Sequence, residues 1–555
     1  MSLITIPQTR ILLIWLRNQF AGGWFPRVPS NQILTLRRVA VLSLTVAVAH
    51  QTLIIWGPIE RLQQFGTVDD TFLYLRVASN WARTGLPSFD GQITTNGFQP
   101  LWGAITALVA TVTDGELLLR VVCQLGSLLN LATGLIVLGI GADLGERRIG
   151  SVAALFYAAF LLTPRTFSGM EGELHGLVFA LLLRATIQHM STDPAALLVG
   201  DTVKLSGYLT LNGLVRLDSG LISAGVALVI LYRMYVRRRA DLYLAFLALP
   251  TLALTLYLGI SQLVFHTPFP VSGSTKWFYV HGVLPRSLPE TILFAATGTV
   301  DRLLSTLGAL IPSAVRYALP ILGLGGFIWG RHLTRRARVF LLIFGFTLLH
   351  LFVFYAAMQE FAYANWYYRP LTLCLAVFLG YAVTLCPRGA SGRLLLATGT
   401  IILLLALATR AYHSWHWESS PSSLYVNRYR AAQWLETTDD LAPPVVVGAW
   451  NSGQLGFFAP SRRVINLDGL VQSVDYVDTV LRPNAWKQYF RQQGIRYIMD
   501  YNVKFKYRDK KTQSIPRAWD ESKSFRGVVD LTQVRVMHSF LDIQVLDLTE
   551  WLNQP

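Results

Sequence analysis

The sequence predicts a polytopic α-helical membrane protein that ends in a small α/β domain. Of its 555 residues, 52% are hydrophobic and 14% are charged, whereas a soluble protein of this length carries about a quarter charged residues. Apolar runs of about 20 residues, the length that crosses a bilayer, recur between residues 38 and 410 and then stop. Beyond residue 410 the apolar residues come in short runs, which are typical of strands in a soluble domain.

The net charge of +16 would suggest a nucleic-acid partner if the protein were soluble. Here the arginines cluster in short loops between apolar runs, so the positive-inside rule explains them and we expect no nucleic-acid partner. The three cysteines lie in apolar runs and indicate no disulfide framework. Basic residues before the first span place the N-terminus in the cytoplasm: Arg10, Arg17, Arg27, Arg37 and Arg38.

The first span is predicted at 39–56, and the segment after it, 57–100, forms the first external loop. Segment 101–143 contains two apolar stretches split by Asp114-Gly115-Glu116, and we favour one net crossing there. On this basis we expect about eleven spans, with about thirteen as the alternative, and a large external loop at 264–315. The remaining spans are predicted at 149–163, 173–190, 198–214, 219–235, 241–263, 316–330, 339–357, 371–386 and 394–410.

The chain therefore divides into a membrane domain, 1–410, and an extracytoplasmic α/β domain, 411–555. In the second part, strands are expected at the apolar runs 445–447, 464–465 and 497–499, and a helix at 484–493.

The first external loop opens with two adjacent carboxylates, Asp69 and Asp70. Leu73, Val77 and Trp81 follow at every fourth residue, which predicts a helix with one apolar stripe. The carboxylates can be caps of this helix, which is the commoner role for either residue alone, or they can perform chemistry.

Further charged residues fall at the ends of predicted spans on the same external face. Such groups at membrane depth are costly and usually functional, although each also has a structural interpretation as a helix cap, an ion pair or a snorkelling side chain. We interpret His175 as a core histidine, and no spacing of His, Asp and Glu indicates a metal cage, so no cofactor is required and metal dependence is left open. The charged residues at this face are Glu171, Glu173, Arg216, Asp218, Lys276 and Arg369.

Carboxylates and cations on one face suggest a reaction. A carboxylate can accept the proton of an attacking hydroxyl, and Arg and Lys can stabilise a phosphate leaving group, which on a membrane lipid would lie at this depth. The aromatic residues near these cations can flank a sugar or an isoprenoid, or they can form an ordinary interfacial belt. They are Trp277, Tyr279, Trp366, Tyr367 and Tyr368.

Several motifs, taken in order along the chain, resemble those of the GT-C membrane glycosyltransferases that use polyprenyl-phosphate sugars. The similarity is to the group of bacterial arabinofuranosyltransferases, lipid A aminoarabinose transferases and protein O-mannosyltransferases, and it extends over most of the chain. The sequence departs from the group's pattern at Leu217, where proline is commoner, and at 271–274, where Asn-Thr is frequent. The motifs are Asp69-Asp70-Thr-Phe-Leu-Tyr-Leu-Arg76, Thr95-Asn-Gly-Phe-Gln-Pro-Leu-Trp102, Ser168-Gly-Met-Glu171, Arg216-Leu-Asp218, the segment from Pro270 to Lys276, Trp366-Tyr-Tyr-Arg-Pro370, Gly456-Phe-Phe458 and Val464-Ile-Asn-Leu-Asp-Gly-Leu470.

The resemblance implies a role for each matching residue. Asp69 would be the base that activates the acceptor hydroxyl, with Asp70 supporting it or exchanging roles with it. Lys276 and Arg369 would hold the donor phosphate with help from Arg216. The sugar and acceptor pocket would include Glu171 and Asp218. The implied reaction is inverting and would take place at the outer side of the cytoplasmic (inner) membrane.

Two other classes of function remain open from the sequence. A lipid or glycan transporter or flippase would also place polar residues within spans, but it predicts paired repeats with broken helices near mid-membrane, and neither is present in the sequence. A non-catalytic membrane protein with a binding ectodomain is the second alternative. The glycine pattern from Gly448 to Gly456 weakly resembles a phosphate loop and is more often a turn. The sequence identifies neither the sugar, a pentose or a hexose, nor the acceptor, a lipid, a glycan or a protein.

Overall fold

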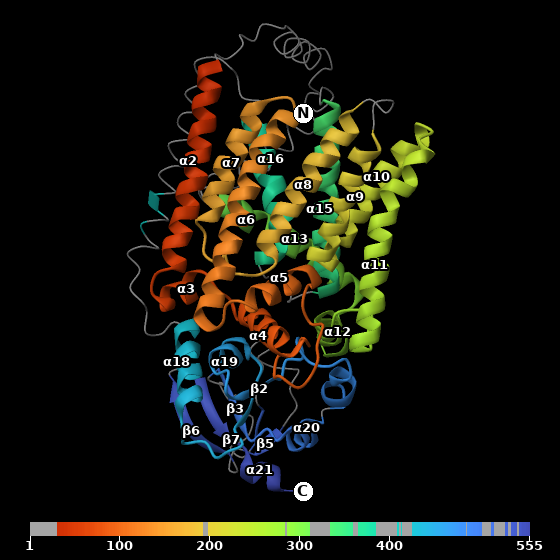
Figure 1. The fold of residues 1–555 in the computed structure, drawn as a ribbon. Coiled ribbons are helices and arrows are strands. Elements are labelled where there is room, and N and C mark those ends of the chain that lie inside the picture. Colours follow the sequence, from red (N-terminus) through yellow and green to blue (C-terminus); the bar gives the residue numbers. More distant parts are fainter. Residues whose placement is uncertain are drawn as a thin grey trace, which may run out of the picture.

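A computed structural model describes most of the chain as a helical bundle with a mixed α/β unit at one end (Figure 1). The described residues are 30–192, 198–283, 286–310, 334–358, 365–384, 408–409, 412, 424–483, 485–501, 512–514, 528–530, 534–540 and 543–554.

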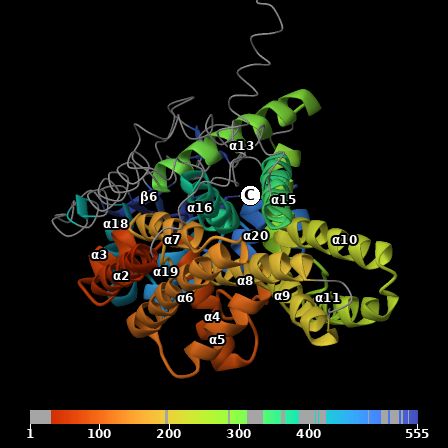
Figure 2. The ribbon, with the colours of Figure 1, turned by 90° about the horizontal axis from the view of Figure 1, so that it is seen from above.

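Ten helices form the bundle in the described part of the chain, and α7 packs against α2, α6 and α16. Seen from above, α7 and α8 lie in the middle, whereas α10 and α11 lie at one edge (Figure 2). Helix α11 exposes large apolar side chains such as Leu244 and Leu263, as expected for a helix that faces lipid. The ten helices are α2 (Ser30–Ile55), α6 (Gly115–Asp143), α7 (Arg147–Leu161), α8 (Gly172–Ser191), α9 (Val199–Val215), α10 (Gly220–Val236), α11 (Tyr243–Phe265), α13 (Leu288–Leu310), α15 (Arg335–Met358) and α16 (Arg369–Thr384).

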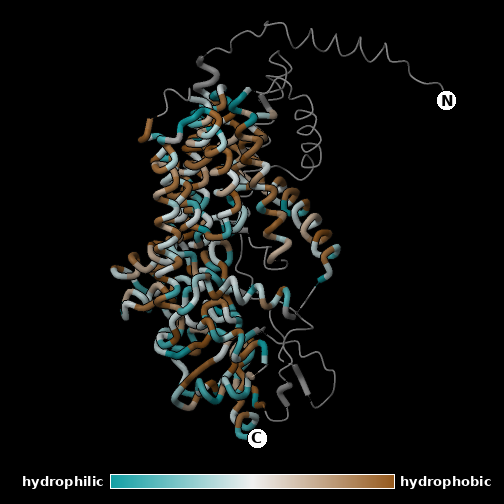
Figure 3. Tube along the Cα trace, turned by 90° about the vertical axis from the view of Figure 1, so that its right-hand side faces the viewer, coloured by the Kyte–Doolittle hydropathy of each residue, from teal (hydrophilic) through white to brown (hydrophobic). Residues whose placement is uncertain are grey.

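Most of the predicted spans coincide with these helices within a few residues. Among the described residues, five helical segments are long and apolar enough to cross a membrane: Thr35–Ile55, Gly115–Asp143, Leu217–Val236, Tyr243–Phe265 and Arg335–Met358. Hydrophobic residues dominate along the bundle and become rarer toward the C-terminus (Figure 3). Of the other predicted spans, 316–330 lies outside the described residues and 394–410 lies outside them except for 408–409, so the total of eleven stays a prediction.

The segment 101–143 contains one long helix and one short one. Helix α5 (Pro100–Ala110) has 11 residues and rises about 16 Å, too little to cross a hydrocarbon core of about 30 Å. Helix α6 has 29 residues and is long enough to cross alone. This favours the single net crossing that the sequence suggested.

The segment 264–315, expected as one long external loop, instead contains two helices. Helix α12 (Val271–Phe278) is short, whereas α13 has 23 residues and packs against α15. A side chain at Gly298 of α13 would meet the ring of Tyr355, so the two helices approach closely. Polar residues within α13, including the buried Arg302, concealed this helix from a hydropathy pattern.

At one end of the bundle, short helices lie between the spans and the C-terminal unit (Figure 1). They are α3 (Ile59–Phe65), α4 (Asp69–Thr84), α5 and α12. Helix α4 begins at Asp69, as the sequence predicted. Val68 before it is extended, and the backbone N–H of Val68 donates a hydrogen bond to the Thr71 hydroxyl at 3.3 Å. Of the predicted stripe, Leu73 and Val77 are buried.

Residues from 424 onward form the C-terminal unit, a mixed sheet with strand order β2-β1-β3-β7-β6 and helices around it. Strand β1 pairs in parallel with β2 and β3, and β7 is antiparallel to β3 and β6. The predicted strands and helix are confirmed, while the expected boundary at 410–411 lies outside the described residues. The elements are α18 (Leu424–Thr437), β1 (Val446–Ala449), α19 (Gly453–Phe458), β2 (Arg463–Asn466), α20 (Trp486–Gln493), β3 (Tyr497–Tyr501), β6 (Arg535–Phe540), β7 (Ile543–Asp547), α21 (Thr549–Asn553) and a separate antiparallel pair, β4 (Thr512–Ser514) and β5 (Val528–Asp530).

Candidate active site

The first turn of α4 holds two neighbouring carboxylates in different surroundings. The Asp69 carboxylate accepts hydrogen bonds from the backbone N–H groups of Gly453 (3.1 Å) and Gln454 (3.2 Å), at the start of α19. Arg428 of α18 adds an ion pair at 3.2 Å. Asp69 is therefore held by three donors of the C-terminal unit.

Asp70 accepts no hydrogen bond from the part of the chain that the structure describes, and among the nearby charged groups Lys276 affects it most. Burial raises the pKa of Asp70 to about 6; the positive charge of Lys276 opposes this shift, whereas Asp69 and Glu171 add to it. A carboxylate with free lone pairs and a raised pKa is suited to accept a proton near neutral pH.

Lys276 of α12 donates a hydrogen bond to the Tyr367 hydroxyl at 2.8 Å. Burial disfavours the charged amine, but Tyr367 and Asp70 more than offset this, and the pKa of Lys276 lies above its usual value. The residue is thus a cation across from Asp70, positioned by the 3₁₀ turn η7 (Asn365–Tyr368).

Arg216 approaches the same tyrosine from another side. It lies between α9 and η2 (Leu217–Ser219), where it forms an ion pair with Glu171 and another with Asp218 at 2.8 Å. Its guanidinium lies 4.3 Å from the centre of the Tyr367 ring. Arg216 and Lys276 therefore contact one side chain from two elements, which forms a cluster of two cations around Tyr367.

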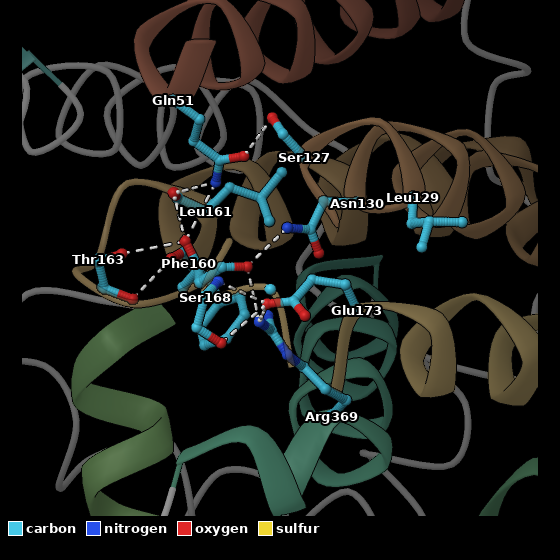
Figure 4. Close-up of polar contacts among 12 residues, drawn as sticks. Gln51, Ser127, Leu129, Asn130, Phe160, Leu161, Thr163, Ser168, Glu173 and Arg369 are labelled. Carbon is cyan, nitrogen blue, oxygen red and sulfur yellow. Dashed lines mark hydrogen bonds and ion pairs between the residues drawn. The ribbon is translucent and has the colours of Figure 1, made fainter. Parts of the chain in front are cut away.

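Arg369 lies in a separate contact inside the bundle. Its Nη2 donates to the carbonyl oxygen of Thr166 at 2.7 Å and to the Glu173 carboxylate at 2.9 Å (Figure 4). Both side chains of this pair are buried, at 2% and 0% exposure. Glu173 also accepts a hydrogen bond from the backbone N–H of Ser168. These contacts hold Arg369 within the protein.

Of the seven residues to which the resemblance gives a role, the structure brings five together around Tyr367 and the start of α4: Asp70, Lys276, Glu171, Arg216 and Asp218. Asp69 is adjacent to them but turned to the C-terminal unit, and Arg369 is bound to Glu173. His175 is fully buried. Within the described ranges, no group of three or more His, Cys, Asp and Glu residues could hold a metal ion.

Sequence reasoning missed three residues near the site. Tyr367 was noted only as an aromatic, and nothing in its motif indicates that it joins two cations. Arg428 looked like one more basic residue of a polar segment. Asp468 lies in the motif 464–470 that carried part of the resemblance, which was the one available signal, and its carboxyl group is buried near Asp69 and Asp70.

No protein-family model and no curated protein sequence matches this chain. Solved structures do match. The oligosaccharyltransferase of Archaeoglobus fulgidus in the apo form aligns with a TM-score of 0.54 at 14% identity, over 83% of this chain and 69% of that one. ArnT from Cupriavidus metallidurans in the apo state aligns with a TM-score of 0.54 at 15% identity, over 93% of this chain and 98% of that one. The same ArnT bound to undecaprenyl phosphate aligns with a TM-score of 0.53 at 12% identity, over 95% and 100%.

These alignments cover most of this chain and define its fold, and together with the five helical segments long and apolar enough to cross a membrane among the described residues they support an integral membrane protein. The resemblance inferred from the sequence motifs is confirmed for the fold, which this chain shares with an oligosaccharyltransferase and with ArnT. Because the identities are 12–15%, the likeness concerns the arrangement of the chain, and the chemistry has to be argued from the site.

Proposed function

We propose that this protein is a membrane glycosyltransferase that transfers a sugar, a pentose or a hexose, from a polyprenyl-phosphate donor to a hydroxyl group of an acceptor. The acceptor is a glycan, a lipid or a protein. The protein lies in the cytoplasmic membrane with its N-terminus in the cytoplasm, and the site and the C-terminal unit face the other side.

One observation carries the proposal: Asp70, a carboxylate without a hydrogen bond from the described residues, is close enough to Lys276 for the charge of each to shift the pKa of the other, and Lys276 and a second cation, Arg216, both contact Tyr367. A transferase that displaces a phosphate needs both functions within one substrate length, a proton acceptor and a cationic site for the leaving group. ArnT, which shares the fold, binds undecaprenyl phosphate.

Of the two adjacent carboxylates, we propose Asp70 as the base in place of Asp69. The lone pairs of Asp69 are engaged by Gly453, Gln454 and Arg428, and protonation would weaken all three contacts. Asp70 has no such partners in the described part of the chain, and its raised pKa favours proton uptake. Asp69 supports it by fixing the start of α4.

The proposed reaction is a single displacement with inversion. The acceptor oxygen forms a bond with the anomeric carbon while Asp70 takes the hydroxyl proton. The bond between that carbon and the phosphate oxygen breaks, and its electron pair leaves with polyprenyl phosphate. Lys276 and Arg216 stabilise the resulting charge. Because Arg369 is bound to Glu173, a role in holding the donor phosphate has no support from its contacts.

Glu171 and Asp218 are proposed to form the sugar or acceptor pocket. Each uses one carboxylate oxygen for Arg216. The other oxygen of each is buried and accepts no hydrogen bond from the described residues. Such oxygens are suited to the hydroxyl groups of a sugar, because a buried acceptor without a partner gains from binding a donor.

The test is transfer by the purified protein with a panel of polyprenyl-phosphate sugars and mixed acceptors. Asp70→Asn should lower the rate by on the order of 10²–10⁴-fold, and Lys276→Ala by on the order of 10²–10³-fold. Asp478→Asn is the matched control, since its side chain is 67% exposed in the C-terminal unit.

Normal transfer by Asp70→Asn, with loss in Asp69→Asn, would return the base to Asp69. If the wild type transfers no sugar from any donor but moves lipid or glycan across vesicles, the transporter function takes the place of this proposal.

A further inference from the structure

The next inference rests on the proposed function and concerns the C-terminal unit. We propose that this unit is a clamp that holds α4 and α12 at a fixed separation and so positions Asp70 relative to Lys276. In this role it is part of the catalytic apparatus, although it supplies neither the base nor the phosphate-binding cations.

The first arm of the clamp holds α4. Asp69, the chain neighbour of Asp70, is bound by the backbone N–H groups at the start of α19 and by Arg428 of α18. The glycine pattern from Gly448 to Gly456, which resembles a phosphate loop in the sequence, covers the end of β1, the loop after it and most of α19. The N–H groups of Gly453 and Gln454 in this pattern bind the Asp69 carboxylate where a phosphate loop would bind an anion.

The second arm holds α12. Thr275, the chain neighbour of Lys276, donates a hydrogen bond from its hydroxyl to the carbonyl oxygen of Gly469 at 3.0 Å. One turn later the Tyr279 hydroxyl donates to the carbonyl oxygen of Asp468 at 2.9 Å. Thus each proposed reacting residue is preceded in the chain by a residue that is bonded to the C-terminal unit.

Apolar packing joins the first external loop to the C-terminal unit. Residues of the first external loop, including Leu73, Val77 and Phe98, share a hydrophobic core with Val447 and Leu470 of the C-terminal unit. A large apolar interface of this kind opposes relative motion of the parts that it joins. The carboxyl group of Asp468 lies near Asp70 and Asp69. Its burial raises its pKa to about 8, and the negative charges of Asp70 and Asp69 add to this shift.

Two glycines show how closely the parts approach. A Cβ atom at Gly97 of the first external loop would lie 1.9 Å from the carbonyl oxygen of Leu470. A Cβ atom at Gly453 would lie 2.2 Å from the carbonyl oxygen of Asp69. Both obstacles are backbone atoms of the other part, so a methyl group at either position must push the two parts away from each other.

Positioning of this kind matters because displacing a reacting group by about 1 Å can cost on the order of 10²-fold in rate. The base and the phosphate-binding lysine lie on separate short helices, α4 and α12. The C-terminal unit is bonded to both.

The experiment compares Gly453→Ala with Gly259→Ala in the full-length protein. A Cβ atom at Gly259 of α11 meets no atom within 4 Å, which makes it the matched control. Two quantities are measured: transfer at saturating donor, and backbone hydrogen exchange by mass spectrometry in α12 and in 453–458. For Gly453→Ala we expect faster exchange in both segments, including α12, which the substitution does not touch, and a loss of transfer of on the order of 10²-fold. Gly259→Ala should leave both at wild-type values.

A second variant, Thr275→Val with Tyr279→Phe, removes both hydrogen bonds of the α12 arm without adding bulk. It should lower transfer and speed exchange at 453–458, at the opposite arm. The clamp is overturned if either variant speeds hydrogen exchange only in the segment that contains its substitution, or if Gly453→Ala speeds exchange in neither segment. It is also overturned if exchange is faster in both segments while transfer stays at the wild-type rate. If the wild type shows no transfer, the proposed function fails. The hydrogen exchange of α12 and of 453–458 in the two variants still decides whether the clamp exists.

Discussion

Two buried arginines of the bundle, Arg216 and Arg369, have different surroundings, although both follow an aromatic or apolar stretch in the sequence. Arg216 forms ion pairs with two carboxylates and lies over the Tyr367 ring beside Lys276. Arg369 is bound to Glu173 and to a backbone carbonyl between packed helices (Figure 4). Both are equally buried, so burial alone does not identify a functional cation. The two arginines differ in their neighbours: those of Arg216 include groups suited to bind a substrate, and those of Arg369 do not.

The largest effect is expected when Arg369 is replaced by an uncharged residue. Arg369→Met leaves Glu173 buried without its cation, which should lower the free energy of unfolding by about 3–5 kcal/mol. The affinity of the remaining folded protein for undecaprenyl phosphate should not change. Chemical unfolding in detergent and a lipid-binding titration measure the two quantities.

The double variant Arg369→Met with Glu173→Gln is the control and should recover part of the lost stability, because no unpaired charge remains. A folded Arg369→Met protein that no longer binds undecaprenyl phosphate would remove the distinction between the arginines and support the role implied by the resemblance.

A smaller effect is expected at the ring that joins the cations. Tyr367→Phe keeps the ring under Arg216 but removes the hydroxyl that accepts the hydrogen bond from Lys276. The lost charge-assisted bond should cost about 1.5–3 kcal/mol of transition-state stabilisation, read from kcat/KM for transfer. An unchanged kcat/KM would indicate that Lys276 is positioned by other groups.

The smallest effect is the pH dependence of transfer. Asp70 must be deprotonated to act as the base, and its pKa is raised to about 6. The rate should therefore fall as pH falls through about 6, by about tenfold per pH unit below it. Asp69→Asn removes a negative charge that contributes to this raised pKa, so the acidic limb should move to lower pH. A limb that does not move would place the titrating group elsewhere.

The sequence predicted which charged residues are unusual and which end of the bundle carries them, because charge within apolar segments is visible in a single chain. It did not predict their partners. Asp69 binds Gly453 and Gln454, which lie 384 and 385 residues away, and Lys276 meets Tyr367 across 91 residues. Such pairs depend on which helices pack against each other, and the hydrophobic periodicity of a sequence predicts helices but not their neighbours.

The same limit explains the choice between the two adjacent carboxylates. On one helical turn, Asp69 and Asp70 point in different directions, and only the position of α19 decides which of them is bonded. Helix α13 was hidden for a different reason: Glu290, Asp301 and Arg302 interrupt its apolar stretch, so no uninterrupted apolar run of span length is visible in the sequence. Strands β1, β2 and β3 of the C-terminal unit were predictable because each contains a short apolar run next to turn residues, whereas β4 (Thr512–Ser514) has no apolar residue to indicate it.

The shared core of the first external loop and the C-terminal unit has a consequence for biosynthesis. The ribosome makes Asp69 and the apolar stripe of α4 early, and the residues that cover them follow 384 positions later. At about 5–20 residues per second, this interval lasts roughly 20 to 80 seconds. During that time Leu73 and Val77 lack the part of their hydrophobic core that the C-terminal unit supplies. A nascent chain that stalls before residue 453 would therefore present an apolar helix beside the membrane, where chaperones and proteases of that compartment could recognise it.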